Sequence, residues 1–193
     1  MATLSSLSGN VYYHWMIDVL PRIGILKNST WSLDHIDWFV VNSLTHDFQQ
    51  ETLKAAGIPL ERVIESDRTP YINAQTLVAP SFPGHLDWVS QGTIDFLRST
   101  FLQNTSEAVK GRSSSLSKAL QVTSPDGPRL YISRANARYR RVLNEAAVID
   151  HLQSFGFIPI ALETLSVAEQ VHLFANAQAI ISPHGSSLTN IVF

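Results

Sequence analysis

The sequence has no cysteine, so disulfide bonds, thiolate zinc sites and cysteine nucleophiles are all excluded. It also has no Asp-x-Asp pair, and its seven histidines are not spaced with carboxylates in a way that would form a preformed metal cage. We therefore expect no essential metal ion and no other cofactor.

Long apolar runs and a strong net charge are lacking as well. No stretch approaches the roughly 18 apolar residues of a membrane-spanning helix, and the first residues lack the basic-then-apolar pattern of a secretory signal. The formal net charge of -2 provides no general attraction for nucleic acid. These absences predict a soluble, cytoplasmic protein without a transmembrane segment and without a nucleic-acid partner.

Hydrophobic residues make up 45% of the 193 residues and charged residues 16%, which is enough apolar material for a folded core. The hydrophobic periodicity predicts an α/β protein. In the first half we expect helices over 11–27, 47–56 and 91–102 and strands over 36–41, 63–64 and 76–79. In the second half we expect strands over 130–133, 157–162 and 179–182, helices over 145–153 and 167–176, and another helix from Ser186.

Between the two halves the composition turns to Ser, Thr, Gly and Lys, which is typical of a connection. We therefore expect an N-terminal α/β domain over 1–105, a Ser-rich linker over 106–128 and a C-terminal α/β domain over 129–193. Strand–helix–strand repeats with short links predict parallel sheets with right-handed crossovers. The three strands of the second half then end at one edge, where such sheets bind ligands.

The turn after the last of these strands carries small residues, Gly185, Ser186 and Ser187, next to His184. Small residues let the backbone bend closely around a ligand, and the free N–H groups of a following helix favour phosphate oxygens. We assign these four residues to a diphosphate site. An ordinary tight turn with a serine N-cap is the competing interpretation.

Five of the ten arginines cluster just before and after the first strand of the second half. Guanidinium groups suit phosphate oxygens, so Arg134 and Arg138 are assigned to the same diphosphate site. Arg140 and Arg141 are interpreted as a solvated face that pairs with Glu145 or Asp150.

Two residues at the same predicted edge are assigned to the nucleoside. Ser133 ends the first strand of the second half, and Glu163 follows the next strand along the chain. A carboxylate in that place can accept hydrogen bonds from ribose hydroxyls. A solvated loop glutamate is an equally good interpretation of Glu163.

In the first half, His14 and Asp18 are four residues apart on the expected helix and so share a face. A carboxylate in that position can orient an imidazole and raise its basicity, which is the arrangement of a general base. Packing among the neighbouring aromatic residues is the competing interpretation. Pro21 is expected to end or kink the helix just beyond.

Three stretches in this order resemble glycosyltransferase family 61: Tyr13 to Arg22, Leu130 to Glu145, and Gly156 to Asn190. The last, with the run Pro183-His184-Gly185-Ser186-Ser187, is the most specific. The resemblance implies a GT-B-like fold of two Rossmann-like halves and an inverting, metal-independent transfer of sugar. The implied donor is a nucleotide sugar, usually a UDP sugar, and the implied acceptor is a glycan or a glycoprotein.

The resemblance also implies roles and a setting. His14, with Asp18 as its orienting partner or as the base itself, would deprotonate the acceptor hydroxyl, and the N-terminal helix would face the turn at Pro183. Plant members decorate xylan with pentoses, animal members add N-acetylglucosamine to protein, and bacterial members are mostly assigned to surface polysaccharide pathways. A bacterial type implies the cytoplasm, and a eukaryotic one the Golgi or ER lumen.

Two features depart from the family pattern. Ser186 and Ser187 stand where similar proteins often have two alanines, and the chain ends at Phe193 inside an expected helix, so the C-terminal half is expected to be incomplete. The alternative function is therefore a non-catalytic or truncated nucleotide-binding module of the same fold. A His/Asp metal hydrolase is a third hypothesis, for which the sequence presents too few ligands.

Overall fold

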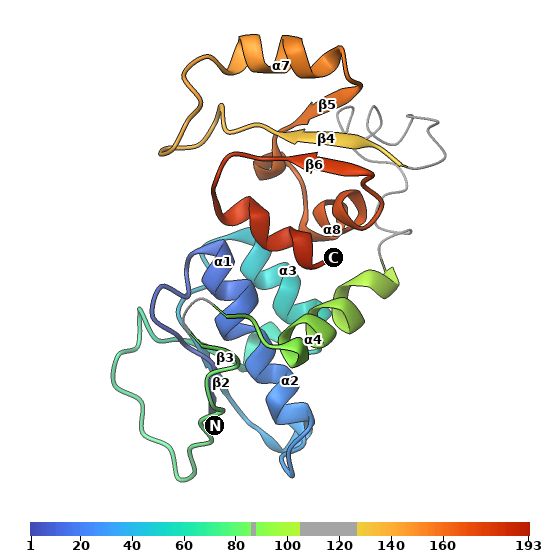
Figure 1. Cartoon of the computed structure of the whole chain (residues 1–193). Helices are drawn as coiled ribbons and strands as arrows, with labels where there is room; N and C mark the ends of the chain where they lie inside the picture. The colour runs from blue at the N-terminus through green and yellow to red at the C-terminus, as the bar shows by residue number, and fades with distance from the viewer. Residues whose placement is uncertain (86–87, 105–126) are drawn as a thin grey trace. The chain divides into compact units, whose positions relative to one another are not determined.

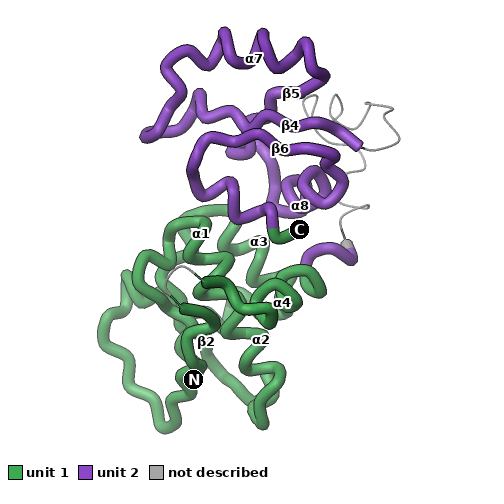
Figure 2. Tube along the Cα trace, viewed as in Figure 1, with its two compact units in different colours: residues 1–100, 192 green, residues 101–191, 193 purple. Residues whose placement is uncertain are grey.

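The computed structural model describes residues 1–85, 88–104 and 127–193. The chain forms two compact units, Met1–Thr100 with Val192 and Phe101–Ile191 with Phe193, which we call unit 1 and unit 2 (Figure 2). Most of the predicted linker, 106–126, lies outside the described residues.

Unit 1 is a three-stranded parallel sheet with helices, in the order β1-β2-β3 (Figure 1). Its elements are β1 (Ala2–Thr3), α1 (Tyr12–His14), the π-helical segment η1 (Trp15–Val19), α2 (Pro21–Lys27), η2 (Leu33–His35), β2 (Phe39–Val41), α3 (Asp47–Ala55), η3 (Leu60–Arg62), β3 (Val63–Glu65) and α4 (Gln91–Phe101). The last residue of α4, Phe101, already belongs to unit 2.

The strand β2 is central and buried at all three positions, as expected for a strand paired on both sides. It begins at Phe39 and is shorter than predicted, and the predicted strand over 76–79 is reduced to a single parallel bridge between Ala2 and Val78. The strand β1 was not predicted, because two residues carry no periodic signal. The core of unit 1 gathers around the sheet and the first helices; its largest fully buried side chains include Leu4, Trp15, Met16, Leu20, Ile23, Phe39 and Leu53.

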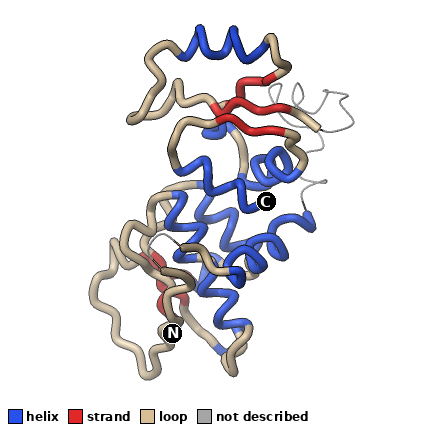
Figure 3. The backbone as a smooth tube through the Cα atoms, viewed as in Figure 1, coloured by secondary structure: helices blue, strands red, loops and turns tan. Residues whose placement is uncertain are grey.

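Unit 2 contains a second parallel sheet, in the order β5-β4-β6 (Figure 3). Its further elements are η4 (Leu102–Asn104), β4 (Arg129–Ile132), α7 (Glu145–Gln153), β5 (Phe157–Ile160), η5 (Leu162–Thr164), α8 (Val167–Ala175), β6 (Ala179–Ile181) and the 3-10 helix η6 (Ser186–Val192). The register pairs Ile132 with Ile160 and Tyr131 with Ile181. The three strands therefore end side by side, as the sequence predicted.

The core of unit 2 is built from the strands and α8. Its buried residues are Leu130, Ile132, Ile160, Leu162, Leu165, Leu173 and Phe174. A capping box begins α8: the Ser166 hydroxyl accepts from the Glu169 N–H, and the Glu169 carboxylate accepts from the Ser166 N–H. In contrast, α7 buries only Glu145.

A glycine follows each of two helices. Gly57 ends α3 with φ +87° and Gly156 follows α7 with φ +79°, left-handed values that glycine adopts without steric cost. No helix in the three described ranges combines the length and the apolar character needed to cross a membrane.

Candidate functional site

His14 and Asp18 form a close pair in unit 1. The Nδ1 atom of His14 lies 2.7 Å from Oδ2 of Asp18. The Asp18 side chain is 10% exposed, whereas that of His14 is 38% exposed. An ionised carboxylate only accepts, so a neutral imidazole in this contact carries its hydrogen on Nδ1 and has a lone pair on Nε2. The pair can therefore act as an oriented base.

The backbone under this pair is a π-helical turn. The N–H of Leu20 donates to the carbonyl of Trp15 at 3.0 Å, a five-residue spacing. Pro21, which has no N–H, begins α2, so of the two expected outcomes the helix is locally distorted before the proline and does not end there. One wider turn lets helical backbone continue on both sides of the proline, and such turns are common at functional sites.

Two side chains fasten this turn to the rest of unit 1. Arg22 donates from Nε to the carbonyl of Asp18 at 3.1 Å and from Nη1 to that of Ser5 at 3.3 Å. Burial lowers the pKa of Arg22, and the charge of Asp18 partly offsets this effect. The indole N–H of Trp15 donates to the hydroxyl of Thr52 at 2.8 Å, and both residues are fully buried.

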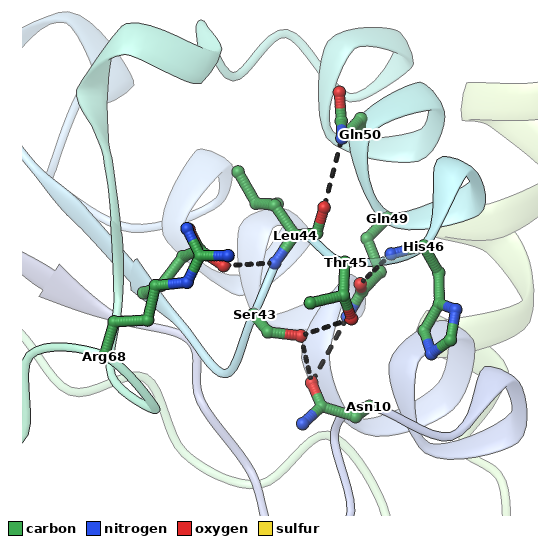
Figure 4. Close-up of polar contacts among 9 residues, drawn as sticks. Asn10, Ser43, Leu44, Thr45, His46, Gln49, Gln50 and Arg68 are labelled. Carbon is green, nitrogen blue, oxygen red and sulfur yellow. Dashed lines mark hydrogen bonds and ion pairs between the residues drawn. The ribbon is translucent and has the colours of Figure 1, made fainter.

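Asn10, just ahead of α1, is the centre of a polar network at the carboxyl ends of β2 and β3 (Figure 4). Its Oδ1 accepts from the Ser43 hydroxyl at 2.8 Å and from Nε2 of Gln49 at 3.3 Å. Its Nδ2 donates to Asp67 at 2.7 Å. Glu65 accepts from the N–H of Leu44 in the same region. The start of the His14 helix is thus tied to two strand ends and to α3.

In unit 2 the predicted edge brings Ser133 and Ser182 to neighbouring strand ends. The N–H of Ser133 donates to the carbonyl of Ile160 at 2.9 Å, and its hydroxyl accepts from the N–H of Ala135 at 3.2 Å. Glu163 is exposed within η5, after β5. The two residues assigned to the nucleoside therefore lie on adjacent strand-end loops.

Arg134 reaches the turn at Gly185, where a Cβ atom added to the glycine would overlap with Nη1 of the arginine. The same guanidinium donates from Nε to the carbonyl of Arg140 at 3.1 Å and from Nη2 to that of Tyr139 at 2.7 Å. Arg134 therefore uses two of its donor atoms to fold its own loop, and its main effect is to position that loop against the turn.

Arg140, and not Arg138, contacts the turn. Its Nη1 lies 2.8 Å from Nδ1 of His184. Arg140 and Arg141 are both exposed, as expected for a solvated face, but neither forms an ion pair with Glu145 or Asp150 among the described residues. A guanidinium can only donate, so Nδ1 of His184 accepts and the ring hydrogen lies on Nε2. The pair thus presents a cation beside an N–H donor.

Arg138 is exposed and lies over the ring of Tyr139, at 5.2 Å from the centroid. The hydroxyls of Ser182 and Ser187 are 3.5 Å apart, and Ser186 caps nothing, because the N-cap of η6 is Gly185. A helix begins at Ser186 as expected, and it is the seven-residue 3-10 helix η6. Any anion site here therefore depends on side chains and not on a helix dipole.

A buried carboxylate, Glu145, is hydrogen-bonded to β4 and to the residue that follows Ser133 at the sheet edge. Glu145, 9% exposed, accepts from the Tyr131 hydroxyl at 3.0 Å and from the N–H of Arg134 at 2.9 Å. Burial and the bond to Glu145 raise the pKa of Tyr131 to about 12. Glu145 was missed as a supporting residue, since its sequence signal is that of an ordinary acidic first helical turn.

The structure thus groups the candidate residues in two places. His14 and Asp18 lie together in unit 1, and Arg134, His184 and Gly185 lie together in unit 2 with Arg140, which the sequence assigned to a solvated face. Within the described ranges no cluster of three or more His, Asp or Glu side chains is arranged to hold a metal ion.

The family model named Glycosyltransferase 61 matches residues 12–193. Among curated proteins and among solved structures there is no significant match. Because the matched region covers nearly the whole chain, including both candidate groups, this chain belongs to glycosyltransferase family 61.

Proposed function

We propose that this chain transfers a sugar from a nucleotide-sugar donor, a UDP sugar, to a hydroxyl of a glycan or protein acceptor, with inversion at the anomeric carbon and without a metal ion. The observation that carries the proposal is the 2.7 Å contact between His14 and Asp18 inside the matched region. It supplies the base that an inverting transfer requires.

In the proposed reaction the acceptor oxygen forms the new bond to the anomeric carbon while the bond from that carbon to the diphosphate breaks. The proton of the acceptor hydroxyl passes to Nε2 of His14, and the buried Asp18 carboxylate stabilises the imidazolium that results. The bonding electrons leave with the diphosphate, which carries the developing negative charge.

Arg140 and His184 are proposed to receive that charge in unit 2, with Ser186 and Ser187 as further donors. The support is chemical: a guanidinium and an imidazole N–H beside a close-packed glycine turn can donate to phosphate oxygens without a metal ion. A GT-B arrangement, with the base and the donor site on different domains, fits the separation of the two groups between the units.

The test is a pair of measurements on the purified chain. UDP in the presence of EDTA is expected to raise the melting temperature, because binding to the folded state alone stabilises it. If no nucleoside diphosphate raises the melting temperature, the donor proposal is refuted. Stabilisation that requires Mg²⁺ would refute the metal-free form.

Transfer to a glycan acceptor is then measured for wild type and for His14→Gln. Loss of a general base lowers kcat by about 100- to 10,000-fold. His35→Gln, a change at an exposed histidine of the same unit, is the matched control and should retain activity. A chain that binds UDP but transfers to no acceptor, with or without His14, would be the non-catalytic module instead.

A further inference from the structure

The loop that joins β4 to α7 is held in one conformation by its own arginine. Two donor atoms of Arg134 bind the carbonyls of Tyr139 and Arg140, and Arg134 accepts at its carbonyl from the N–H of Ala137 at 3.0 Å. Arg140 has φ +57°, a left-handed conformation that costs a non-glycine residue roughly 1–2 kcal/mol. Such strained positions persist when surrounding contacts fix them, and they concentrate at ligand sites.

This fixed loop presents an aromatic ring to solvent. Tyr139 is 66% exposed, although the guanidinium of Arg138 lies 5.2 Å from its ring centroid. The next residue along the chain, Arg140, contacts His184. A planar ring, a cation beside it and one proposed diphosphate contact, Arg140, therefore occur within three consecutive residues of a loop to which Arg134 is hydrogen-bonded.

We propose that Tyr139 is the stacking platform for the nucleobase of the donor. The inference rests on the proposed function, because it takes Arg140 and His184 to hold the diphosphate of the same nucleotide. The base and the diphosphate of one nucleotide are joined by a single ribose, so the groups that bind them must be close neighbours. Adjacent Cα atoms are about 3.8 Å apart, which keeps Tyr139 and Arg140 within that reach.

Stacking of a base on an aromatic ring is favourable for every base, since each has a π face, and a neighbouring arginine adds a cation–π contribution. Arg138, which the sequence assigned to the diphosphate, then lies beside the base instead. A base stacked on Tyr139 would cover a ring that is 66% exposed.

The experiment compares two ligands on the full chain, UDP and inorganic pyrophosphate, by calorimetry. Tyr139→Ala is expected to weaken UDP binding by roughly 5- to 150-fold while leaving pyrophosphate binding unchanged. Tyr139→Phe, which keeps the ring, should bind UDP as wild type does. Tyr71→Ala removes another highly exposed tyrosine, 94% exposed in unit 1, and should bind both ligands normally.

A second variant reports stacking directly. In Tyr139→Trp, UDP should quench the fluorescence of the added indole, whereas pyrophosphate should not. Tyr139→Phe supplies the background of the four native tryptophans.

The outcomes separate the two proposals. Normal UDP binding by Tyr139→Ala, or an equal loss for UDP and pyrophosphate, would overturn the platform while the donor site stands. The platform would also be overturned if the wild-type chain bound UDP no more tightly than pyrophosphate. A wild-type chain that binds no nucleoside diphosphate would overturn the donor site and the platform together.

Discussion

Nη1 of Arg140 and Nδ1 of His184 lie 2.8 Å apart, although 44 residues separate them in the sequence. Because arginine can only donate, this contact places the histidine hydrogen on Nε2. The two side chains act as one unit with two kinds of donor.

Arg140→Ala is therefore expected to lower UDP affinity by about tenfold or more, the effect of losing a hydrogen bond to a charged group and the histidine orientation with it. Isothermal titration calorimetry measures the change. Arg141→Ala removes the same charge from the adjacent, exposed residue and should have little effect. Equal losses in the two variants would mean that only total positive charge matters.

Gly185→Ala is expected to displace the guanidinium of Arg134, because the new Cβ would overlap with Nη1. The carbonyls of Tyr139 and Arg140 then lose their donors, so the melting temperature and UDP affinity should both fall. Overpacking of this kind costs about 1–3 kcal/mol.

Gly92→Ala is the matched control for this change. Gly92 lies in α4, where an added Cβ would meet only the Ser90 hydroxyl oxygen at 4.0 Å. Alanine is the better helix former by up to about 1 kcal/mol, so this variant should be as stable as wild type or more stable. If Gly185→Ala behaves in the same way, the close approach of Arg134 to the turn is not rigid.

Much of the fold could be predicted because its signals are local. The capping box at Ser166, the glycine stops at Gly57 and Gly156, and the β-branched strands of unit 2 depend on a few adjacent residues each. Their parallel order then follows from the alternation of strands and helices. The strand β1 lacked such a signal, since pairing with β2 and not composition makes it a strand.

The site was less predictable because its geometry is long-range. The π turn at Trp15 depends on how the chain passes Pro21. The role of Arg140 depends on its left-handed backbone conformation and on the hydrogen bond from Arg134 to its carbonyl. Spacing did identify the His14–Asp18 contact, since residues four apart on a helix meet. Spacing could not tell which arginine of the cluster meets His184.

Tyr131 is expected to make the protein sensitive to alkali. Its pKa is raised to about 12 in the folded state, against about 10 in an unfolded chain. Between these values only the unfolded state loses the proton, so the free energy of unfolding should fall as pH rises from 10 to 12. Denaturant unfolding at several pH values measures this.

Tyr131→Phe should have a shallower alkaline loss, at the cost of about 1 kcal/mol at neutral pH from the lost bond to Glu145. Tyr71→Phe, at an exposed tyrosine, should keep the wild-type pH dependence. The same alkaline slope in Tyr131→Phe and in wild type would assign the loss to another group.

His172 in α8 is expected to act at the opposite end of the pH range. Its Nδ1 is buried and has no hydrogen-bond partner within the described residues, and burial lowers its pKa. As pH falls below about 6.5 the unfolded state takes up the proton first, so the free energy of unfolding should decrease.

His172→Leu removes both the proton site and the unpartnered nitrogen. We expect the free energy of unfolding to rise by about 1 kcal/mol at neutral pH. Its decrease in acid should be less steep, because up to one fewer proton is taken up on unfolding. His151→Gln, at an exposed histidine of α7, should change neither. An unchanged acid slope in His172→Leu would show that this imidazole accepts its proton freely in the fold.

Asn10 is expected to position His14 without touching substrate. Asn10→Ala removes the bonds to Asp67, Ser43 and Gln49, and it leaves polar atoms of buried Ser43 and Gln49 short of a partner. The free energy of unfolding should fall by about 1–3 kcal/mol, the cost of unsatisfied buried groups. Because α1 begins two residues later, kcat for transfer should fall while UDP affinity is unchanged.

Asn10→Asp separates the acceptor role of Asn10 from its donor role. It keeps an acceptor for Ser43 and Gln49 but sets a second carboxylate against Asp67, so stability should fall at neutral pH and recover as the pH is lowered toward 4. Asn73→Ala, at an exposed asparagine of the same unit, is the neutral control. Full activity in a destabilised Asn10→Ala protein would limit the network to folding, whereas a lower kcat at unchanged UDP affinity requires that it hold the His14 helix in place.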